Sequence, residues 1–399
     1  MPGPSASIQR DLLIGTTAVA VVTDATLLPF FPDMFRESFG VDDPRHVGMY
    51  LAATCLTVML VLPVWARIER RWSTLRLLTV GQAGAGALAL ASFAASSVEV
   101  FWACSLAMVT FKASYLLVYP YVMRLEDESN HERTIGLLTV IVHLGAIAGA
   151  TIGGWVLEHY APRAGYLVMA AGDFAMMFVS MGLVRRGATV PQREAKTHGE
   201  ERFDPRVVAR ALAKLGAVMA VFYFAVFMVR PFFVAYWSTL SESGGELVAG
   251  WVFSIPAWAS LAALALDRRR PPRPRSLWAY LPLIGLGLAL QCVPQPAVII
   301  IGRFVFGWGV FRAMVKLDLA LFATSPPSRY ARDFSRMNLC QQGGVLVAFY
   351  AAGAAVAEGG LVWPFFVAIG AMLLVALAHL AVGAAYRPKP VQSPVEASV

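Results

Sequence analysis

Apolar segments of membrane-spanning length recur along the whole chain. An α-helix needs about 20 apolar residues to cross a bilayer. Scanning for that length gives twelve segments, at 12–31, 47–66, 77–95, 100–123, 136–157, 164–184, 215–238, 247–266, 276–294, 297–322, 337–357 and 361–384. Only 15% of the residues are charged, against about 25% in soluble domains. The sequence therefore predicts an all-α protein with twelve transmembrane helices, embedded in the lipid bilayer.

One long polar interval, 185–214, divides these segments into two sets of six. We therefore expect an N-terminal six-helix bundle at 1–184, a cytoplasmic central loop at 185–214 and a C-terminal six-helix bundle at 215–386. The remaining residues, 387–399, are rich in proline and polar side chains and predict a flexible cytoplasmic tail.

The distribution of lysine and arginine predicts the topology, because these residues prefer cytoplasmic loops. With the N-terminus inside, 25 of the 33 fall in cytoplasmic segments, and three fall on the opposite side, Arg36, Arg45 and Arg163. The other five lie inside the apolar segments. Both termini are therefore predicted to be cytoplasmic. The net charge of +8 follows from this topology, so we expect no nucleic-acid partner.

Short repeated motifs predict that the two bundles are related by duplication. Pro29-Phe30-Phe31 ends the first segment, and Pro231-Phe232-Phe233 lies near the end of the seventh, 202 residues later. Val109–Ala113 in the fourth segment parallels Gly309–Ala313 in the tenth, 200 residues later. Two nearly equal offsets favour a pseudo-symmetric pair of six-helix units, as many secondary transporters have.

Charged side chains inside the apolar segments are the strongest functional signal. A charge at mid-membrane costs about 2.5–3.5 kcal/mol even on a lenient scale, so such residues generally face a polar path or a partner. The segment 297–322 alone carries four charges. Helical spacing places aromatic side chains beside the cations, which suits a solute with an apolar or aromatic part. The candidate solute and coupling residues are Asp24, Lys112, Tyr115, Tyr119, Tyr223, Arg230, Trp308, Arg312 and Lys316.

The alternative is that these charges pair with one another and hold the bundles together. Asp24 can neutralise Lys112 or Arg230. We expect Arg303 and Asp318 to form an internal ion pair. Cations outnumber acids by five to two on these segments, so pairing cannot account for all of them. An anionic or zwitterionic solute would complete the set, since guanidinium binds carboxylate or phosphate in a bidentate manner.

Two further buried candidates concern protons. His143 lies in the fifth segment and Asp173 lies mid-span in the sixth. Histidine titrates near neutrality, and acids inside membranes often lie on proton routes. We consider both for a proton relay, with a purely structural role as the alternative. Asn338, Gln341, Gln342, Ser254 and Trp258 are weaker candidates for the lining of a cavity.

Three local motifs resemble those of the major facilitator superfamily. After its second helix the family shows Gly-x-x-x-Asp-Arg-x-Gly-Arg-Arg. Residues 63–71 keep the basic cluster (Arg67, Arg70, Arg71) without the aspartate, and the counterpart after the eighth segment has Asp267 and Arg268. Its proton-antiporter branch carries Gly-x-x-x-Gly-Pro-x-x-Gly-Gly in the fifth helix. The corresponding glycines here are Gly145, Gly149, Gly153 and Gly154, with Ala150 in place of the proline.

This resemblance covers the whole chain and implies a transporter that works by alternating access. In that family the first, fourth, seventh and tenth helices line the central cavity, and each of these segments here carries an ionisable residue. The motif 67–71 and its counterpart imply a cytoplasmic gate. The glycines of the fifth segment favour a proton-coupled exporter of a drug-like compound or a secreted metabolite such as a siderophore. The alternatives are a proton-coupled importer of an organic anion and a non-transporting membrane receptor or assembly factor.

Other classes of protein lack support in the sequence. There is no Gly-x-x-x-x-Gly-Lys-Ser/Thr phosphate loop, no histidine pattern with metal spacing and no nucleophile motif. We therefore expect no enzyme activity, no cofactor and no metal. Abundant alanine, glycine and arginine with little lysine are typical of a GC-rich bacterium. This predicts a multi-pass protein of the bacterial inner (cytoplasmic) membrane, functional as a monomer, whose partners are a small solute and protons.

Overall fold

The computed structural model describes residues 6–125, 131–188, 205–241, 245–269, 277–325 and 330–383. We call residues 6–188 the N-half and residues 205–383 the C-half. The N-half contains α1 (Ala6–Leu27), η1 (Leu28–Phe30), α2 (Phe31–Phe39), α3 (Pro44–Glu69), α4 (Thr74–Phe93), α5 (Val98–Lys112), η2 (Ala113–Leu117), α6 (Val118–Leu125), α7 (His131–His159), η4 (Pro162–Ala164) and α8 (Gly165–Arg185). The C-half contains α9 (Pro205–Met228), α10 (Phe233–Ser238), α11 (Gly245–Arg269), η5 (Leu277–Ala279), α12 (Leu281–Gln291), α13 (Pro296–Thr324), α14 (Tyr330–Gly359) and α15 (Trp363–Gly383).

The described elements confirm the predicted fold class, because they are all helical and each of the twelve apolar segments coincides with a helix or a run of helices. Ten of these are long and apolar enough to cross a membrane, and two shorter apolar helices, Leu277–Gln291 and Trp363–Ala378, complete the set. One boundary differs: α9 begins at Pro205, so its first turns lie in the interval expected to be loop. Residues 189–204 and the predicted tail 387–399 lie outside the described part.

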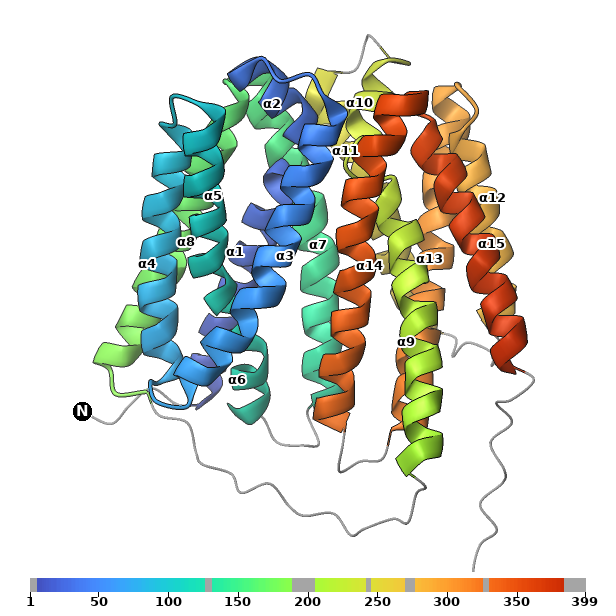
Figure 1. The fold of residues 1–399 in the computed structure, drawn as a ribbon. Coiled ribbons are helices and arrows are strands. Elements are labelled where there is room, and N and C mark those ends of the chain that lie inside the picture. Colours follow the sequence, from blue (N-terminus) through green and yellow to red (C-terminus); the bar gives the residue numbers. More distant parts are fainter. Residues whose placement is uncertain are drawn as a thin grey trace, which may run out of the picture.

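The repeated Pro-Phe-Phe motifs interrupt a long helix before a short one in both halves. Proline lacks an N–H donor and cannot continue a regular helix. In the N-half, α1 ends at Leu27, the short η1 contains Pro29, and α2 follows. In the C-half, α9 ends at Met228, the chain turns through Pro231, and α10 follows. Both short helices lie at the same end of the molecule (Figure 1), as a duplicated unit requires.

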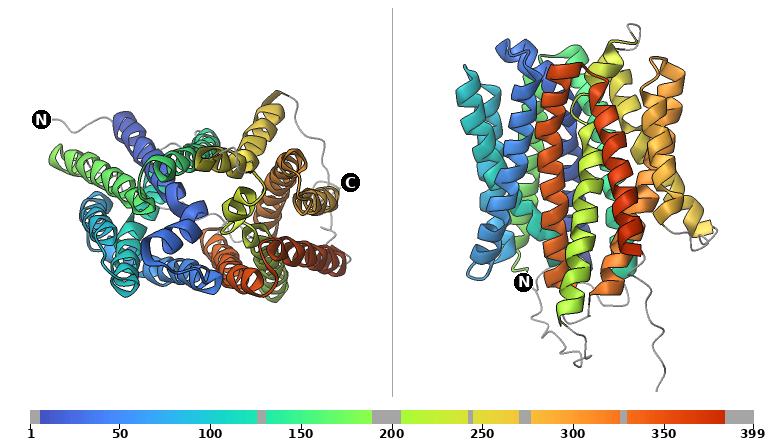
Figure 2. Two further views of the ribbon diagram at one scale, coloured as in Figure 1. Left: turned by 90° about the horizontal axis from the view of Figure 1, so that it is seen from above. Right: turned by 45° about the vertical axis from the view of Figure 1, so that its right-hand side comes forward.

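The two halves stand side by side with their helices roughly parallel (Figure 2). α1 begins and α15 ends at one end of the bundle, which we call the termini end (Figure 1). The opposite end, which carries α2 and α10, is the far end. α3 packs against α14, and α7 packs against α11, so these two helix pairs join the halves.

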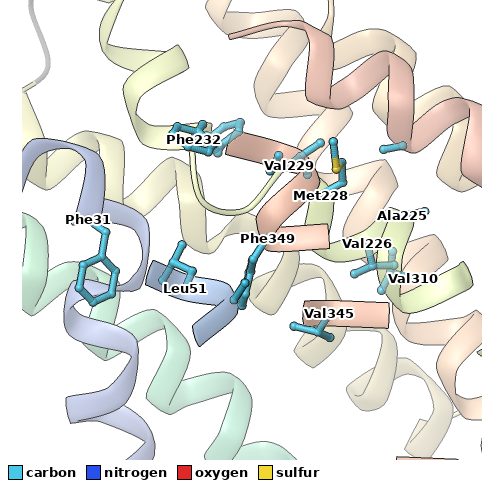
Figure 3. Packing of buried hydrophobic residues seen from close by; sticks show 14 of the residues in the cluster. Phe31, Leu51, Ala225, Val226, Met228, Val229, Phe232, Val310, Val345 and Phe349 are labelled. Atoms are coloured by element: carbon cyan, nitrogen blue, oxygen red, sulfur yellow. The ribbon is translucent and has the colours of Figure 1, made fainter. Parts of the chain in front are cut away.

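Apolar side chains from both halves meet in one continuous core. Figure 3 shows Leu51 of α3 beside Phe349 of α14, with Val226 and Val310 deeper in the C-half. Where the paired helices cross near the far end, glycines allow the backbones to touch. A Cβ on Gly353 would collide with the Pro44 carbonyl, and one on Gly154 would collide with the Glu246 carbonyl.

Candidate functional site

The N-half holds a triad of charged side chains at the middle of three membrane-spanning helices. The Lys112 ammonium lies 2.8 Å from Oδ1 of Asp24 and 3.3 Å from Oδ1 of Asp173. The three residues come from α5, α1 and α8, respectively. Each lies near the centre of its apolar span. One ammonium therefore serves two carboxylates, and the fully ionised triad carries one negative charge in excess.

The two carboxylates of the triad differ in exposure. The side chain of Asp173 is fully buried and that of Lys112 is 6% exposed, whereas that of Asp24 is 35% exposed. Neither oxygen of Asp173 makes a hydrogen bond to any described residue, so its contact with Lys112 is an ion pair. The Tyr115 hydroxyl lies within hydrogen-bonding reach of Asp24. Asp24 is thus the accessible acid of the triad, and Asp173 lies behind Lys112.

The backbone changes from α-helix to 3-10 helix directly after Lys112. α5 ends at Lys112, and the 3-10 turn η2 follows before the chain resumes as α6. The Gln82 amide donates to Oγ of Ser114 at 3.2 Å and faces the Lys112 carbonyl at 3.5 Å. A 3-10 turn has 3.0 residues per turn, so it changes which residues share a face. Tyr115 therefore lies at the triad, but Tyr119, expected on the same face, is 46% exposed.

The C-half contributes a cation among aromatic rings. Arg230 follows the end of α9, and its guanidinium lies 4.5 Å from the centre of the Phe227 ring. The Tyr223 ring stacks on Phe227 at 6.1 Å with an interplanar angle of 16°. Arg230 is half-buried. It has no acidic residue within ion-pair distance among the described residues.

His143 links the two halves at mid-height. Its ring packs edge-on against Phe311 of α13, with centres 5.8 Å apart and an interplanar angle of 70°. It is also close enough to Arg230 for the two side chains to interact electrostatically. His143 is therefore next to the Arg230 cluster and not part of the triad with Asp173. The two proton-relay candidates lie in different environments.

Arg312 has an acidic partner in its own half. Its guanidinium donates to Oδ2 of Asp267 at 2.6 Å and lies 5.3 Å from the centre of the Trp308 ring. The pair joins α13 to the C-terminal end of α11. Arg312, which we expected to contact the solute, thus binds Asp267, which we expected to form part of the gate. Lys316 and Asp318 follow on α13, half-buried, and neither forms an ion pair with any described residue.

The expected ion pair between Arg303 and Asp318 is wrong. The two residues are 15 apart on one helix, and a rise of 1.5 Å per residue separates them by about 22 Å. Arg303 instead donates to the backbone carbonyls of Val252, at 3.4 Å, and Phe253. The structure makes Arg303 a structural residue.

Pro256 inside α11 explains the partners of Arg303. Proline removes the N–H that would bond to the carbonyl four residues earlier, which here is the carbonyl of Val252. Arg303 satisfies it from the neighbouring helix. The guanidinium also lies over the Phe233 ring, 3.9 Å from its centre. Arg303 is 2% exposed. A proline within an apolar segment was the available sign that a donor was needed here.

The four glycines of the fifth apolar segment face two different neighbours. A Cβ on Gly145, Gly149 or Gly153 would collide with α1 of the same half. A Cβ on Gly154 would instead collide with α11 of the other half. The first three glycines pack the bundle, and the fourth joins the halves.

The gate candidates at the termini end are partly described. Arg67, Arg70 and Arg71 are exposed at the end of α3. Asp267 pairs with Arg312 as above. The side chain of Arg268 lies outside the described part. No group of three or more His, Cys, Asp or Glu side chains that could hold a metal occurs among the described residues.

The arrangement of two six-helix halves with charges at mid-span defines a polytopic membrane protein of the secondary-transporter class. A profile of the Major Facilitator Superfamily matches residues 13–290, and the chain belongs to that family. No curated protein matches the sequence.

Solved structures of low identity share the fold across nearly the whole chain. A bacterial homologue of the human lysosomal transporter Spinster, inward-facing and unoccupied, has a TM-score of 0.74 at 12% identity and covers 98% of this chain and 100% of its own. The peptide transporter POT in complex with sulfate has a TM-score of 0.76 at 14% identity, covering 96% and 95%. The human organic anion transporter MFSD10 has a TM-score of 0.68 at 12% identity, covering 94% and 99%.

Proposed function

We propose that this protein is a proton-coupled secondary transporter that exports a small anionic or zwitterionic, partly apolar solute by alternating access. The observation that carries the proposal is the Asp24–Lys112–Asp173 triad. Three charged groups at mid-span are costly in a membrane. A helix bundle has no structural need for two carboxylates that share one ammonium. The Major Facilitator Superfamily is a family of transporters, and the triad supplies a site for a proton.

The proton binds at the triad. One ammonium between two carboxylates leaves a single negative charge in excess, and one proton removes it. Asp24 is the more exposed acid, so a proton that arrives along a water-filled path meets Asp24 before it meets Asp173. Lys112 then stays charged because Asp173, 3.3 Å away, remains its counterion. Protonation of Asp24 therefore neutralises the site without leaving a buried charge unpaired, which would be strongly destabilising.

The solute binds near Arg230. Its guanidinium has no acidic partner among the described residues, and a fork of N–H donors suits a carboxylate or phosphate. Tyr223 and Phe227 offer an aromatic surface for the apolar part of the solute. Trp308 and Lys316 lie on α13, which packs against α9, and they remain candidates for solute contact. Two structural neighbours, a peptide transporter in complex with sulfate and an organic anion transporter, are consistent with a solute that carries negative charge.

Export is favoured by the glycines of α7, which resemble the antiporter branch of the family. Candidate cargoes are a drug-like compound or a secreted metabolite such as a carboxylate-bearing siderophore. We place the protein in a bacterial inner membrane, functional as a monomer, with both termini and the termini end on the cytoplasmic side.

Everted membrane vesicles test this proposal. They are energised by respiration, and solute uptake and internal pH are followed together with a panel of radiolabelled aromatic and aliphatic carboxylates. An exporter accumulates its solute in everted vesicles, and adding that solute dissipates the pH gradient. Accumulation in right-side-out vesicles alone would show the importer instead. No response to any member of the panel would contradict the proposal.

A matched pair of variants assigns the proton step. We expect Asp24→Asn to abolish the pH response, because the accessible acid is lost. Asp42→Asn, an exposed acid in the segment between α2 and α3, provides the control and should behave as the parent. Equal pH responses in Asp24→Asn and the parent would remove Asp24 from the coupling step.

A further inference from the structure

At the far end, a carboxylate of one half meets the start of a helix in the other half. Glu158 lies in the last turn of α7, and its Oε2 accepts a hydrogen bond from the backbone N–H of Leu247 at 3.3 Å. Leu247 is the third residue of α11, whose N–H groups at this position have no partner within the helix. A negative charge at a helix N-terminus is stabilising.

The local backbone is built for this approach. Gly245 opens α11 with a φ of +61°, a left-handed conformation that favours glycine. A Cβ at Gly245 would also lie 3.2 Å from the Glu158 carboxylate. One turn earlier on α7, Gly154 brings the backbones of α7 and α11 into contact. Both features place Glu158 against the first turn of α11.

The duplicated half repeats this arrangement. Glu358 lies in the last turn of α14, 200 residues after Glu158. Its carboxylate lies 3.5 Å from the guanidinium of Arg45, the second residue of α3. Gly353 brings α14 against α3 there, as Gly154 does for α7 and α11.

Both carboxylates are exposed, but the two contacts differ in kind. The start of α3 has its own cap, because Asp43 accepts from the Arg45 backbone N–H at 2.9 Å. Glu358 thus meets only a side chain, and that ion pair is 58% and 72% exposed. Exposed pairs of this kind contribute little. Among these two contacts, Glu158 alone binds helix backbone.

We propose that Glu158 is the latch that holds the far end closed and that Glu358 is its weaker two-fold counterpart. Both carboxylates span the boundary that must separate when the far end opens, and neither touches the triad or Arg230. Closure depends on the negative charge of Glu158 at the α11 N-terminus. This inference rests on the alternating-access mechanism proposed above.

A cavity beside the latch offers positions to measure opening. It has a volume of about 340 Å³ and lies between the halves at the far end. Asp42 borders it from the N-half and Ser238 from the C-half, and both are exposed. Spin labels at D42C and S238C, in a variant without the four native cysteines, report the separation of the halves by pulsed electron paramagnetic resonance. The measurement needs no solute and no transport, so it is independent of the coupling assay.

We expect Glu158→Gln to raise the ratio of open to closed populations by about 2- to 5-fold. This is the effect expected when one charge is lost from an exposed helix N-terminus. High salt should shrink the difference, because it screens the charge. Glu358→Gln should have a smaller effect. Glu99→Gln, an exposed acid in the first turn of α5 within the N-half, should match the parent.

Three results would overturn the inference. The first is a distance distribution in Glu158→Gln equal to that in Glu99→Gln. The others are a shift of the distribution in Glu358→Gln, or in Glu158→Asp, as large as the shift in Glu158→Gln. The aspartate variant keeps the charge near the helix and should lie between the parent and the glutamine variant. Elution of each labelled variant as the parent does on size-exclusion chromatography confirms that folded protein is compared. A loss of transport with the latch behaviour intact would count against the proposed function alone.

Discussion

The two halves share one fold but use their buried charges differently. Lys112 and Arg312 occupy equivalent positions, 200 residues apart. Lys112 lies where α5 gives way to a 3-10 turn, between two acids on other helices of its half. Arg312 lies on the unbroken helix α13 and pairs with a single acid, Asp267. The N-half therefore holds an unbalanced set that one proton can neutralise, whereas the Arg312 pair is already neutral.

This difference teaches that equivalent cations need not have equivalent roles. In the C-half, Arg303 satisfies a carbonyl freed by proline and Arg312 joins two helices. Arg230 and Lys316 remain as half-buried cations without an acidic partner among the described residues. We infer that the N-half specialises in the proton and the C-half in the solute. The predictions below test this division, beginning with the largest effect.

Lys112→Ala should abolish transport and lower the stability of the folded protein by about 3–5 kcal/mol, because it leaves two carboxylates without their counterion. The thermal midpoint in detergent and uptake in vesicles measure the two effects. Adding Asp173→Asn should recover part of the stability but not transport. Wild-type transport in Lys112→Ala would break the assignment of the N-half to proton coupling.

Arg230→Ala should weaken binding of an anionic solute by about 10- to 150-fold, because hydrogen bonds to a charged group are lost. The thermal midpoint should stay close to that of the parent. Substrate titration of vesicle uptake gives the change in apparent affinity. Arg230→Lys keeps the charge without the guanidinium fork and should lie between the two. An unchanged affinity in both variants would place the solute elsewhere.

Arg303→Ala should destabilise the protein by about 1–3 kcal/mol, because the Val252 carbonyl loses its buried donor. The remaining folded protein should transport with the affinity of the parent. Thermal unfolding and uptake, normalised to the amount of protein in the membrane, separate the two effects. A variant with normal stability and altered affinity would reverse our assignment of Arg303 as structural.

The Arg312–Asp267 pair should show a coupling energy of about 1 kcal/mol in a double-mutant cycle of Arg312→Ala and Asp267→Ala, since contacting residues couple by about 0.5–3 kcal/mol and both side chains are partly exposed. Thermal midpoints of the four proteins supply the cycle. Additive effects would show that the two side chains act separately. The Arg312 cation would then return to the list of solute contacts.

Much of the fold and part of the site were predictable from the sequence. Each apolar segment became a helix, because burial of an apolar run in a membrane is a local property of that run. Charges at mid-span marked Asp24, Lys112 and Asp173 as special for the same reason. The pairing of Asp24 with Lys112 was one of the alternatives that the sequence left open.

The partners of these residues depended on packing. Asp173 reaches Lys112 because α8 packs against α4, and α4 in turn packs against α5, the helix that ends at Lys112. No spacing along the chain encodes that contact. The 3-10 turn after Lys112 changes the helical phase, so the shared face of Lys112 and Tyr119 expected from a regular helix stays a prediction. The wrong pair of Arg303 with Asp318 was avoidable, since their separation on one helix follows from the helical rise.

The sequence by itself determined the membrane spans, their division into two repeated halves and the presence of buried charges. Each of these depends on local composition or on self-similarity along the chain. The tertiary structure decided which charges are neutralised, which cations lack an acidic partner among the described residues, and which carboxylates cross between the halves at the far end. Those outcomes depend on distances of a few ångström between segments far apart in sequence, because ion pairs and hydrogen bonds form only at such range.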